Sequence, residues 1–405
     1  MSSTECHSSD DNSRSDSYFD RVCDDLSEVI LQFLSFEDKF RLECVSKQFQ
    51  RTVFNRHYDL NIRKIERLLE DRDSDLRNFE TILKKLPNIR YFVDNNYPIF
   101  LSSHKLNDSE LELIMKYSKN LVSFHWDLSE ISENKMNLFL EKFGSKLKSF
   151  STKVKDFELI QSQMKNIEEL DCTETYLSLE QIFQLRFKKL TKFSIEIIYF
   201  KYEQDHLKKQ MNDFRTFVEN HSGITHLSLI LIESSGQDIK YLFWQISRLK
   251  NLVSLKIDTK YTSITNKSLN KCLKHMATNC LKLKSLTIYS VHYRKDSVEP
   301  LFVEQLKNFK ELRELDIDLK CNECLLNESF KGLENLTHLS INFQTSQPIK
   351  EILLKDIDIN LPNLQTLVVW NQFESIEKSI DILCRLSRLK TIKLFVGNKY
   401  FRYTL

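Results

Sequence analysis

Glycine and proline are scarce in this chain, which has five of each among 405 residues. Average usage is about 7% glycine and about 5% proline, so the residues that form tight turns or let a backbone approach a phosphate are largely missing. A glycine-rich nucleotide-binding loop is therefore not expected. Long apolar runs are also missing, since none approaches the roughly 18 residues of a membrane span. Residues 1–17 are polar and lack the basic and apolar parts of a signal peptide, so they predict a disordered tail.

Charge and cysteine content exclude further classes of protein. Lys and Arg number 59 against 57 Asp and Glu, and the formal net charge of +2 predicts no general attraction to nucleic acid or membranes. Nine cysteines without framework spacing are typical of free thiols in a reducing compartment. Cys321 and Cys324 lack a second pair at ligand spacing, so no metal site is expected, and no cofactor either. We expect a soluble protein of the cytoplasm, the nucleus or both.

One short phrase is abundant instead. It consists of an apolar residue, two variable residues, a second apolar residue, one variable residue and usually a third apolar residue, as in Leu252-Val-Ser-Leu-Lys-Ile257. The mean interval between copies is about 27 residues, within the range of about 20 to 29 that is typical of leucine-rich repeats. The twelve copies begin at Ile89, Leu121, Leu147, Ile167, Leu190, Ile224, Leu252, Leu283, Leu312, Leu336, Leu364 and Leu389.

The phrase predicts a strand, because its second and third apolar residues share one face while their neighbours share the other. Segments between the copies, such as 138–143 and 269–276, have apolar residues at helical spacing. Each unit is therefore expected to be one strand plus one helix. The chain resembles a leucine-rich-repeat solenoid of the α/β class, with parallel strands on the concave face and helices outside. Such a solenoid offers a long binding surface.

A second feature lies between the tail and the repeats. Residues 22–34 carry apolar residues at helical spacing, Ser35 or Asp38 can cap the next helix, and the apolar pattern continues to Phe49. About 40 residues are too few to form a stable core easily, so apolar surface is expected to be left for a partner or for the repeats.

This segment resembles the F-box, a small all-helical domain. Asp25-Leu26, Ile30-Leu31 and Phe33-Leu34 match the first half of the family pattern, and Asp38, Arg41-Leu42, Val45-Ser46-Lys47 and Phe49 match the second half without a gap. Cys23 stands where the family normally has Pro, and Lys39 stands at a position that is often apolar. The resemblance implies docking on a Skp-family adaptor that is linked to cullin and RING subunits of an SCF ubiquitin ligase. The residues expected to contact the adaptor are Leu26, Ile30, Leu31, Phe33, Leu34, Asp38, Leu42 and Val45. The alternative is that these residues form only the internal core of the small helices.

The outward positions of the strands are the expected substrate site. Adjacent strands lie about 4.8 Å apart, so acidic and aromatic residues at these positions can form one patch, although Lys256 dilutes its charge. This patch predicts a protein substrate with a basic segment and an apolar anchor. The alternative is that these residues are solvated charges on a face that binds its ligand elsewhere. The predicted residues are Asp258, Tyr289, Glu314, Asp316, Asp318, Asn342 and Trp370.

The predicted organisation is a tail (1–17), an F-box (18–57), a coupling segment and solenoid cap (58–88) and about twelve repeats (89–405). This order of F-box and repeats is similar to that of substrate receptors of SCF ubiquitin ligases, and it implies a non-catalytic chain that binds neither nucleic acid nor membranes. The main alternative is a repeat scaffold that never joins a ligase. An enzyme is a more distant alternative, because no arrangement of nucleophile, base and orienting residue is recognisable.

Overall fold

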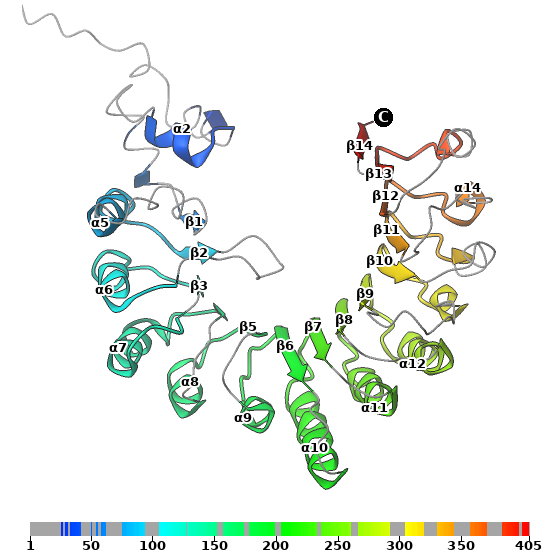
Figure 1. Cartoon of the computed structure of the whole chain (residues 1–405), viewed down its shortest axis with the longest axis horizontal. Coiled ribbons are helices and arrows are strands. Elements are labelled where there is room, and N and C mark those ends of the chain that lie inside the picture. Colours follow the sequence, from blue (N-terminus) through cyan, green and yellow to red (C-terminus); the bar gives the residue numbers. More distant parts are fainter. Residues whose placement is uncertain are drawn as a thin grey trace, which may run out of the picture. The chain divides into compact units, whose positions relative to one another are not determined.

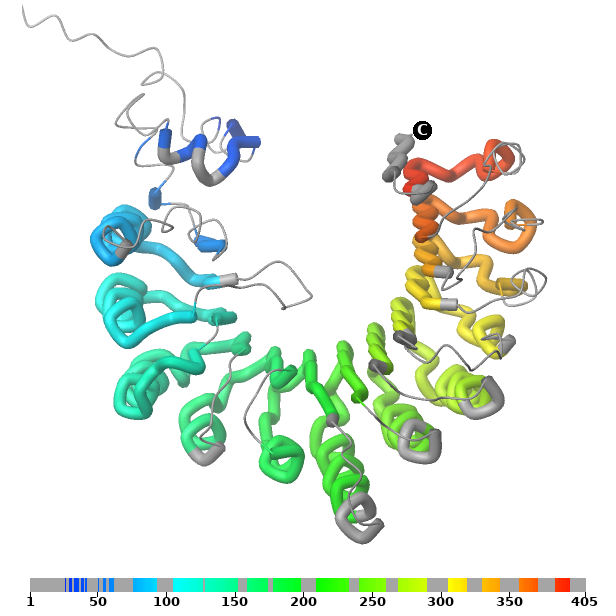
Figure 2. Tube along the Cα trace, viewed as in Figure 1, coloured from blue at the N-terminus to red at the C-terminus, as the bar shows by residue number. Residues whose placement is uncertain are grey.

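The structure of the chain is a computed structural model (Figures 1 and 2). It divides into two compact units: unit 1 comprises residues 1–126 and 130–143, and unit 2 comprises residues 127–129 and 144–405. The structure describes residues 26, 29–30, 33–41, 50, 54–55, 58–61, 75–93, 105–126, 128–151, 157–173, 178–198, 204–232, 236–260, 266–291, 304–319, 330–343, 357–370, 383–396 and 399–404.

In its described residues, unit 1 contains three parallel strands and the helices that alternate with them. β1 pairs with β2, and β2 pairs with β3, with Leu60, Phe92 and Phe124 in register and fully buried. Phe124 also packs against Phe139, with ring centroids 4.9 Å apart. The described elements of unit 1 are α2 (Phe36–Arg41), β1 (Asp59–Asn61), α5 (Asp75–Lys85), β2 (Tyr91–Val93), α6 (Asp108–Tyr117), β3 (Ser123–His125) and α7 (Glu133–Phe143).

Unit 2 continues the same alternation with a longer series of strands. Figure 1 shows its strands along the inner side of a curve, with the helices outside. The described elements of unit 2 are β4 (Ser149–Ser151), α8 (Phe157–Gln163), β5 (Glu169–Cys172), α9 (Leu179–Gln184), β6 (Lys192–Ile198), α10 (Gln204–Asn220), β7 (His226–Ile232), α11 (Gly236–Ile246), β8 (Ser254–Lys260), α12 (Asn266–Asn279), β9 (Ser285–Val291), the 3-10 helix η3 (Glu304–Asn308), β10 (Glu314–Leu319), β11 (His338–Phe343), α14 (Ile357–Asn360), β12 (Thr366–Trp370), β13 (Thr391–Val396) and β14 (Lys399–Thr404).

The twelve phrases correspond to the twelve strands β2–β13. Every one of these strands begins two residues after the first apolar residue of its phrase, and that residue is at most 6% exposed in every copy. The second apolar residue is buried as well, from Phe92 in β2 to Ile392 in β13. Burying one such side chain stabilises the fold by about 1.5–3 kcal/mol. The predicted α/β solenoid is therefore confirmed.

A ladder of side-chain amides joins successive repeats, and the sequence interpretation did not predict it. In six copies an Asn precedes the first apolar residue, and in five of them its amide donates at 2.7–3.3 Å to a backbone carbonyl of the preceding repeat or, for Asn88, of Asn55. In two other copies a Lys takes this position and donates to the Oδ1 of the Asn in the preceding repeat. The five residues are Asn88, Asn166, Asn251, Asn335 and Asn363.

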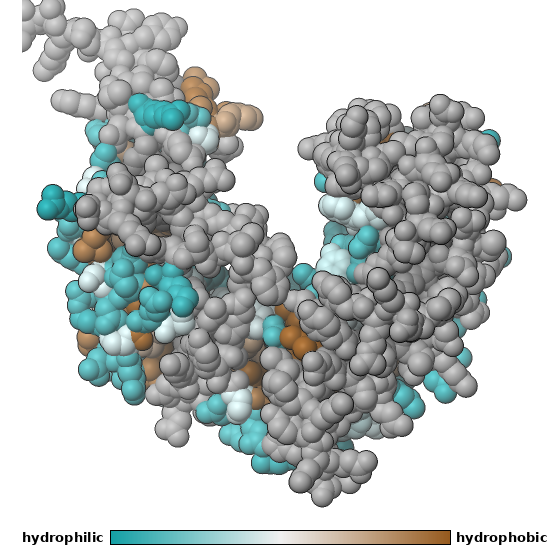
Figure 3. All heavy atoms as spheres, viewed as in Figure 1, coloured by the Kyte–Doolittle hydropathy of each residue, from teal (hydrophilic) through white to brown (hydrophobic). Residues whose placement is uncertain are grey.

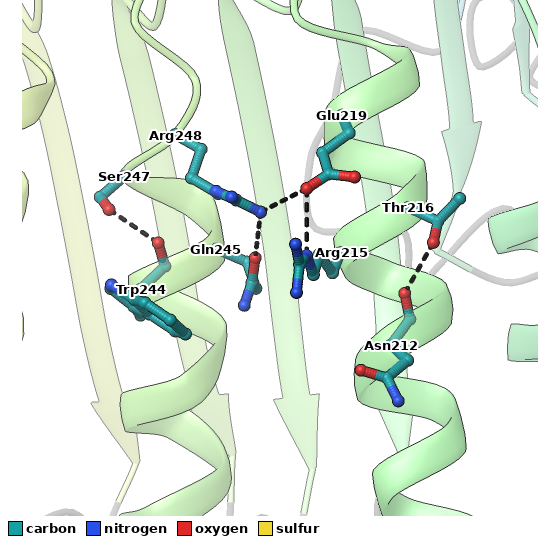
Figure 4. A network of polar contacts seen from close by, with 8 residues as sticks. All are labelled: Asn212, Arg215, Thr216, Glu219, Trp244, Gln245, Ser247 and Arg248. Carbon is teal, nitrogen blue, oxygen red and sulfur yellow. Dashed lines mark hydrogen bonds and ion pairs between the residues drawn. The ribbon is translucent and has the colours of Figure 1, made fainter.

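The helix layer of unit 2 is joined by polar contacts, as Figure 4 shows for α10 and α11. Glu219 on α10 accepts hydrogen bonds from Arg215 Nε at 3.0 Å and from Arg248 Nη1 at 2.5 Å. Arg248 follows α11 in the chain, so this carboxylate connects two neighbouring repeats. The hydrogen bond from Arg215 and the charges of both arginines hold the pKa of Glu219 below its ordinary value.

The last strand closes the series in the opposite direction. β14 pairs antiparallel with β13, from Thr391↔Thr404 to Val396↔Lys399. Phe401 and Tyr403, which the sequence suggested as a cover for the last repeat, lie on β14 opposite Leu394 and Ile392. The final repeat is thus followed by a backbone-paired strand.

Candidate functional sites

The F-box segment of unit 1 contains a helix with a well-defined start. Ser35 is the N-cap of α2, because its Oγ accepts from the backbone N–H of Asp38 at 3.0 Å. The Ser35 hydroxyl donates in turn to Asp38 Oδ2 at 2.7 Å. Of the two caps that the sequence left open, the structure selects Ser35. Asp38, a predicted adaptor contact, lies in the first turn of α2, and its Oδ1 is 3.6 Å from Arg41 Nη1.

Apolar side chains are exposed on the same segment. Phe33 is 84% exposed, Leu26 is 50% exposed and Ile30 is 36% exposed, while Leu34 is half-buried. Val29, which was not among the predicted contact residues, is 48% exposed and adds to the same set. Figure 3 shows apolar atoms gathered at the surface of this part of the chain. The predicted contacts Leu31, Leu42 and Val45 lie outside the described residues.

The end of the F-box segment is anchored within unit 1. Phe54 is 6% exposed and lies under the ammonium of Lys85 on α5, with 5.6 Å between Nζ and the ring centroid. The carbonyl of Tyr58 accepts from the backbone N–H groups of Arg90 and Tyr91 at 2.8 and 3.0 Å. The segment is thus attached to the first repeat by a buried aromatic ring and by backbone hydrogen bonds.

The second candidate site is the outward face of strands β8–β12 in unit 2. The strand registers place Asp258 beside Tyr289, and place Asn342 beside both Asp318 and Trp370. Asp316 lies on the same face, two residues before Asp318 along β10, and Glu314 lies two residues before Asp316. All seven predicted residues therefore share one face, and we call them the strand-face cluster.

Tyr289 is the centre of this cluster. Its hydroxyl donates a short hydrogen bond to Asp316 Oδ2, and the ammonium of Lys256 lies 5.5 Å from its ring centroid. Burial raises the pKa of Tyr289, and the hydrogen bond to Asp316 and the charges of Asp316, Asp318 and Asp258 raise it further. The phenol is therefore a neutral donor that binds a carboxylate, and Lys256 supplies a positive charge beside three negative ones.

The members of the cluster differ in exposure. Glu314 is exposed, and Trp370 is 43% exposed while its Nε1 donates to Ser340 Oγ at 3.3 Å. Asp318 is only 5% exposed, although the sequence placed it on the open face. A ligand on this face can therefore reach Glu314 and the Trp370 ring more easily than Asp318. The sequence interpretation missed Ser340, whose small side chain orients the indole.

Acidic residues on the earlier strands have local partners. Glu169 accepts from Lys192 Nζ at 3.4 Å. Asp171 is 7% exposed and accepts from the backbone N–H and the hydroxyl of Thr173 at 3.0 and 2.8 Å. The acidic surface suggested by the sequence is therefore better developed on β8–β10 than on β5.

The described part of the chain contains neither a metal-binding cluster nor a membrane-spanning helix. Within the described ranges, no group of three or more His, Cys, Asp or Glu side chains is arranged to hold a metal ion. In the same part of the chain, none of the helices has the length and apolar character needed to span a bilayer. Cys321 and Cys324 lie outside the described residues.

Comparisons with known proteins found a family model for the N-terminal segment and a solved structure similar over most of the chain. The F-box domain family model matches residues 19–60. A chain in the crystal structure of the Rad7 and Elc1 complex in yeast is similar over 87% of this chain and 90% of that chain, with 16% sequence identity and a TM-score of 0.50. A chain in the TLR13–ssRNA13 complex matches over 80% of this chain and 48% of that chain, with 14% identity and a TM-score of 0.31. No curated protein sequence matches the chain. The protein therefore combines an F-box domain with a solenoid of strands and helices.

Proposed function

We propose that this chain is the non-catalytic substrate-recognition subunit of an SCF-type ubiquitin ligase. Its F-box docks on a Skp-family adaptor, through which cullin and RING subunits are recruited, and the strand-face cluster binds the protein substrate. The observation that carries the proposal is the set of exposed apolar side chains in the segment that the F-box model matches, with Phe33 at 84% exposure. The solved structure to which this chain is similar is that of a complex of two proteins, Rad7 and Elc1.

The exposed residues explain why this segment needs a partner. Leu26, Val29, Ile30 and Phe33 lie within a span of eight residues, and each is at least 36% exposed. Contiguous apolar side chains on a soluble surface mark interaction sites. An adaptor that covers them supplies the apolar burial that a segment of this size cannot obtain alone.

The mechanism is proximity. A receptor holds a substrate lysine near an activated ubiquitin thioester, which raises the effective concentration of the two reacting groups by orders of magnitude. No catalytic residue is needed in the receptor. What this chain supplies is two binding surfaces on folded units, one for the adaptor and one for the substrate.

The strand-face cluster favours a substrate with a basic segment and an apolar residue. Glu314 is in register with Thr366 through His338, and Trp370 lies four residues beyond Thr366 on β12. This register separates the two exposed groups by about 16 Å, the length of about five extended residues. A substrate segment would satisfy both groups if it had a Lys or Arg that pairs with Glu314 and, about five residues away, an apolar side chain that packs on Trp370.

Co-purification with a Skp-family adaptor tests the proposed adaptor site. In an Ile30→Asp, Phe33→Asp variant both altered side chains are already exposed, so the fold should be retained while adaptor binding is lost. Ile359→Asp is the matched control, because Ile359 is 72% exposed on α14 of unit 2. Retention of the adaptor by the double variant, or its absence from the wild type, would refute the adaptor site and favour a repeat scaffold outside any ligase.

A peptide array tests the proposed substrate face. Peptides that place Lys or Arg at increasing distance from Leu or Trp should bind best near a spacing of about five residues. Glu314→Lys and Trp370→Ala should each remove this preference. Glu334→Lys, which reverses an exposed charge before β11, is the control. Equal binding of peptides with every spacing, or the same loss of preference in the Glu334→Lys variant, would refute the strand-face cluster as the substrate site.

A further inference from the structure

The turns that lead into β8, β9 and β10 share one backbone geometry. In each turn the N–H of the first apolar residue donates to the carbonyl three residues before it: Leu252 to Leu249 at 3.0 Å, Leu283 to Cys280 at 3.1 Å and Leu312 to Phe309 at 3.2 Å. Because the three turns are equivalent, side chains at the same turn position lie in a row from one repeat to the next. This row forms one edge of the sheet in unit 2.

The row is basic with one apolar residue at its centre. Lys250, Leu281 and Lys310 occupy the same turn position in the three successive repeats, and all three are exposed, Leu281 by 69%. Lys284 and Arg313 are exposed at the position that follows the first apolar residue. Leu281 is the one apolar side chain among these exposed neighbours. We call Lys250, Leu281, Lys282, Lys284, Lys310 and Arg313 the basic turn edge.

Hydrogen bonds hold these residues in register. The Arg313 N–H donates to the Lys284 carbonyl at 2.8 Å, so these two residues lie on adjacent rungs of the ladder. Lys282 Nζ donates to Asn251 Oδ1 at 2.8 Å. The turn that carries Lys250 follows Arg248, whose guanidinium is held by Glu219 on α10 (Figure 4). The backbone positions that carry the basic turn edge are therefore fixed from one repeat to the next.

Charge in this array is strongly one-sided, although the whole chain is close to neutral. Three residues flank the first apolar residue of each repeat, two before it and one after it. In the three repeats these nine positions include five cations and one carboxylate, Glu311. Over the whole chain the two signs are nearly equal, at 59 and 57 residues. Within these three repeats the cations thus lie at the turns, while the acidic residues of the same strands lie on the strand face.

We propose that the basic turn edge docks an acidic peptide segment of a partner protein, with an apolar side chain of that segment on Leu281. The exposed leucine between lysines distinguishes this partner from a nucleic acid, whose phosphates need cations and whose bases need aromatic stacking platforms. The nine turn positions contain no aromatic residue. This surface is separate from the strand-face cluster, and the proposal does not depend on membership of a ubiquitin ligase.

Fluorescence anisotropy with the full chain tests the proposal. The probe is a fluorescein-labelled peptide of Asp and Glu with one central Leu, and the comparison peptide has Ser in place of that Leu. We expect saturable binding that weakens with rising salt, because exposed charges are screened. Lys250→Glu with Lys310→Glu should weaken binding of the Leu peptide by at least about tenfold, because two attractive pairs become repulsive. Leu281→Ser should weaken binding of the Leu peptide and leave binding of the Ser peptide unchanged.

The control variant is Lys165→Glu with Lys188→Glu. It makes the same charge change at the same phrase position of the repeats at β5 and β6, where both lysines are exposed. Circular dichroism melting of each variant verifies that it is folded. Three outcomes would overturn the proposal: no saturable binding by the wild type, equal weakening by both double variants, or tighter binding of an oligonucleotide or a phosphatidylserine vesicle than of the peptide.

Discussion

Acidification should loosen the repeats around β6 and β7 through one buried histidine. His221 is 3% exposed and lies in the turn between α10 and β7. Its Nδ1 lies 2.8 Å from the Phe217 carbonyl, and its Nε2 lies 3.1 Å from the backbone N of Phe187 in the preceding repeat. Since the Phe187 N–H can only donate, Nε2 must accept, and the ring proton sits on Nδ1. The two hydrogen bonds therefore require a neutral imidazole.

The direction of the pH effect follows from the pKa of this group. Burial lowers the pKa of His221 below its ordinary value of 6.5, and the positive charge of Arg186 lowers it further, against the opposing effect of the hydrogen bond to the Phe217 carbonyl. Below about pH 6.5 this imidazole is therefore protonated in the unfolded chain, whereas in the folded chain it stays neutral to a lower pH. The stabilisation from neutral His221 is complete above the unfolded pKa and is lost as the pH falls through the folded pKa.

His221→Phe removes the titration and keeps a ring of similar size. The variant leaves the Phe187 N–H without its acceptor, whereas the Phe217 carbonyl keeps the backbone N–H of residue 221 at 3.0 Å. One unsatisfied buried group costs about 1–3 kcal/mol, so we expect a loss of about 1–3 kcal/mol near pH 7.5. The difference in unfolding free energy between wild type and variant should shrink as the pH falls toward about 5. The wild type is then destabilised by protonation of His221, and the variant has no imidazole at this position. Urea unfolding from about pH 7.5 to about pH 5 measures the difference.

Hydrogen exchange of the Phe187 amide gives the local measurement, since repeat arrays can open in parts. Exchange of this amide should accelerate in the wild type on acidification, relative to amides elsewhere in unit 2. His275→Gln alters an exposed histidine on α12 and should leave the pH dependence unchanged. A stability difference between wild type and His221→Phe that stays constant over this pH range would refute the role assigned to His221.

Three further predictions concern single contacts. Asn107→Ala removes the N-cap of α6, whose side chain accepts from two backbone N–H groups, and should destabilise unit 1 by about 1 kcal/mol in urea unfolding; no change would contradict the capping role. Asn335→Ala removes the 2.9 Å hydrogen bond to the Lys310 carbonyl and should cost about 1 kcal/mol of unfolding free energy; stability equal to that of the wild type would show that water replaces the amide. Tyr289→Phe leaves Asp316 without its phenol donor, so we expect tighter binding of a basic peptide to the strand-face cluster in calorimetry, and unchanged affinity would show that Asp316 takes no part.

The two candidate sites could be read from the sequence to different extents. Leu26, Ile30 and Phe33 of the F-box segment were expected as spare apolar residues from helical spacing, because a segment of this size has more large apolar residues than it can bury, whereas the exposed Val29 was not among the predicted contacts. The strand-face positions of Asp258, Tyr289 and Trp370 were also identifiable, because side chains alternate along a strand with a period of two. Their exposure was not identifiable. Asp318 has the same sequence pattern as Asp316, yet it is 5% exposed, and alternation says nothing about what neighbouring strands cover.

The sequence by itself determined the repeat, its register and the faces of its strands. The first apolar residue of each phrase fixes where each strand begins, since only one register buries the apolar set. The tertiary structure decided what depends on the stacking of one repeat on the next: the asparagine ladder, the phenol of Tyr289 on Asp316, the imidazole of His221 between two repeats and the row of cations around Leu281. These groups are about 20 to 35 residues apart in the chain and become neighbours only when adjacent strands pair about 4.8 Å apart.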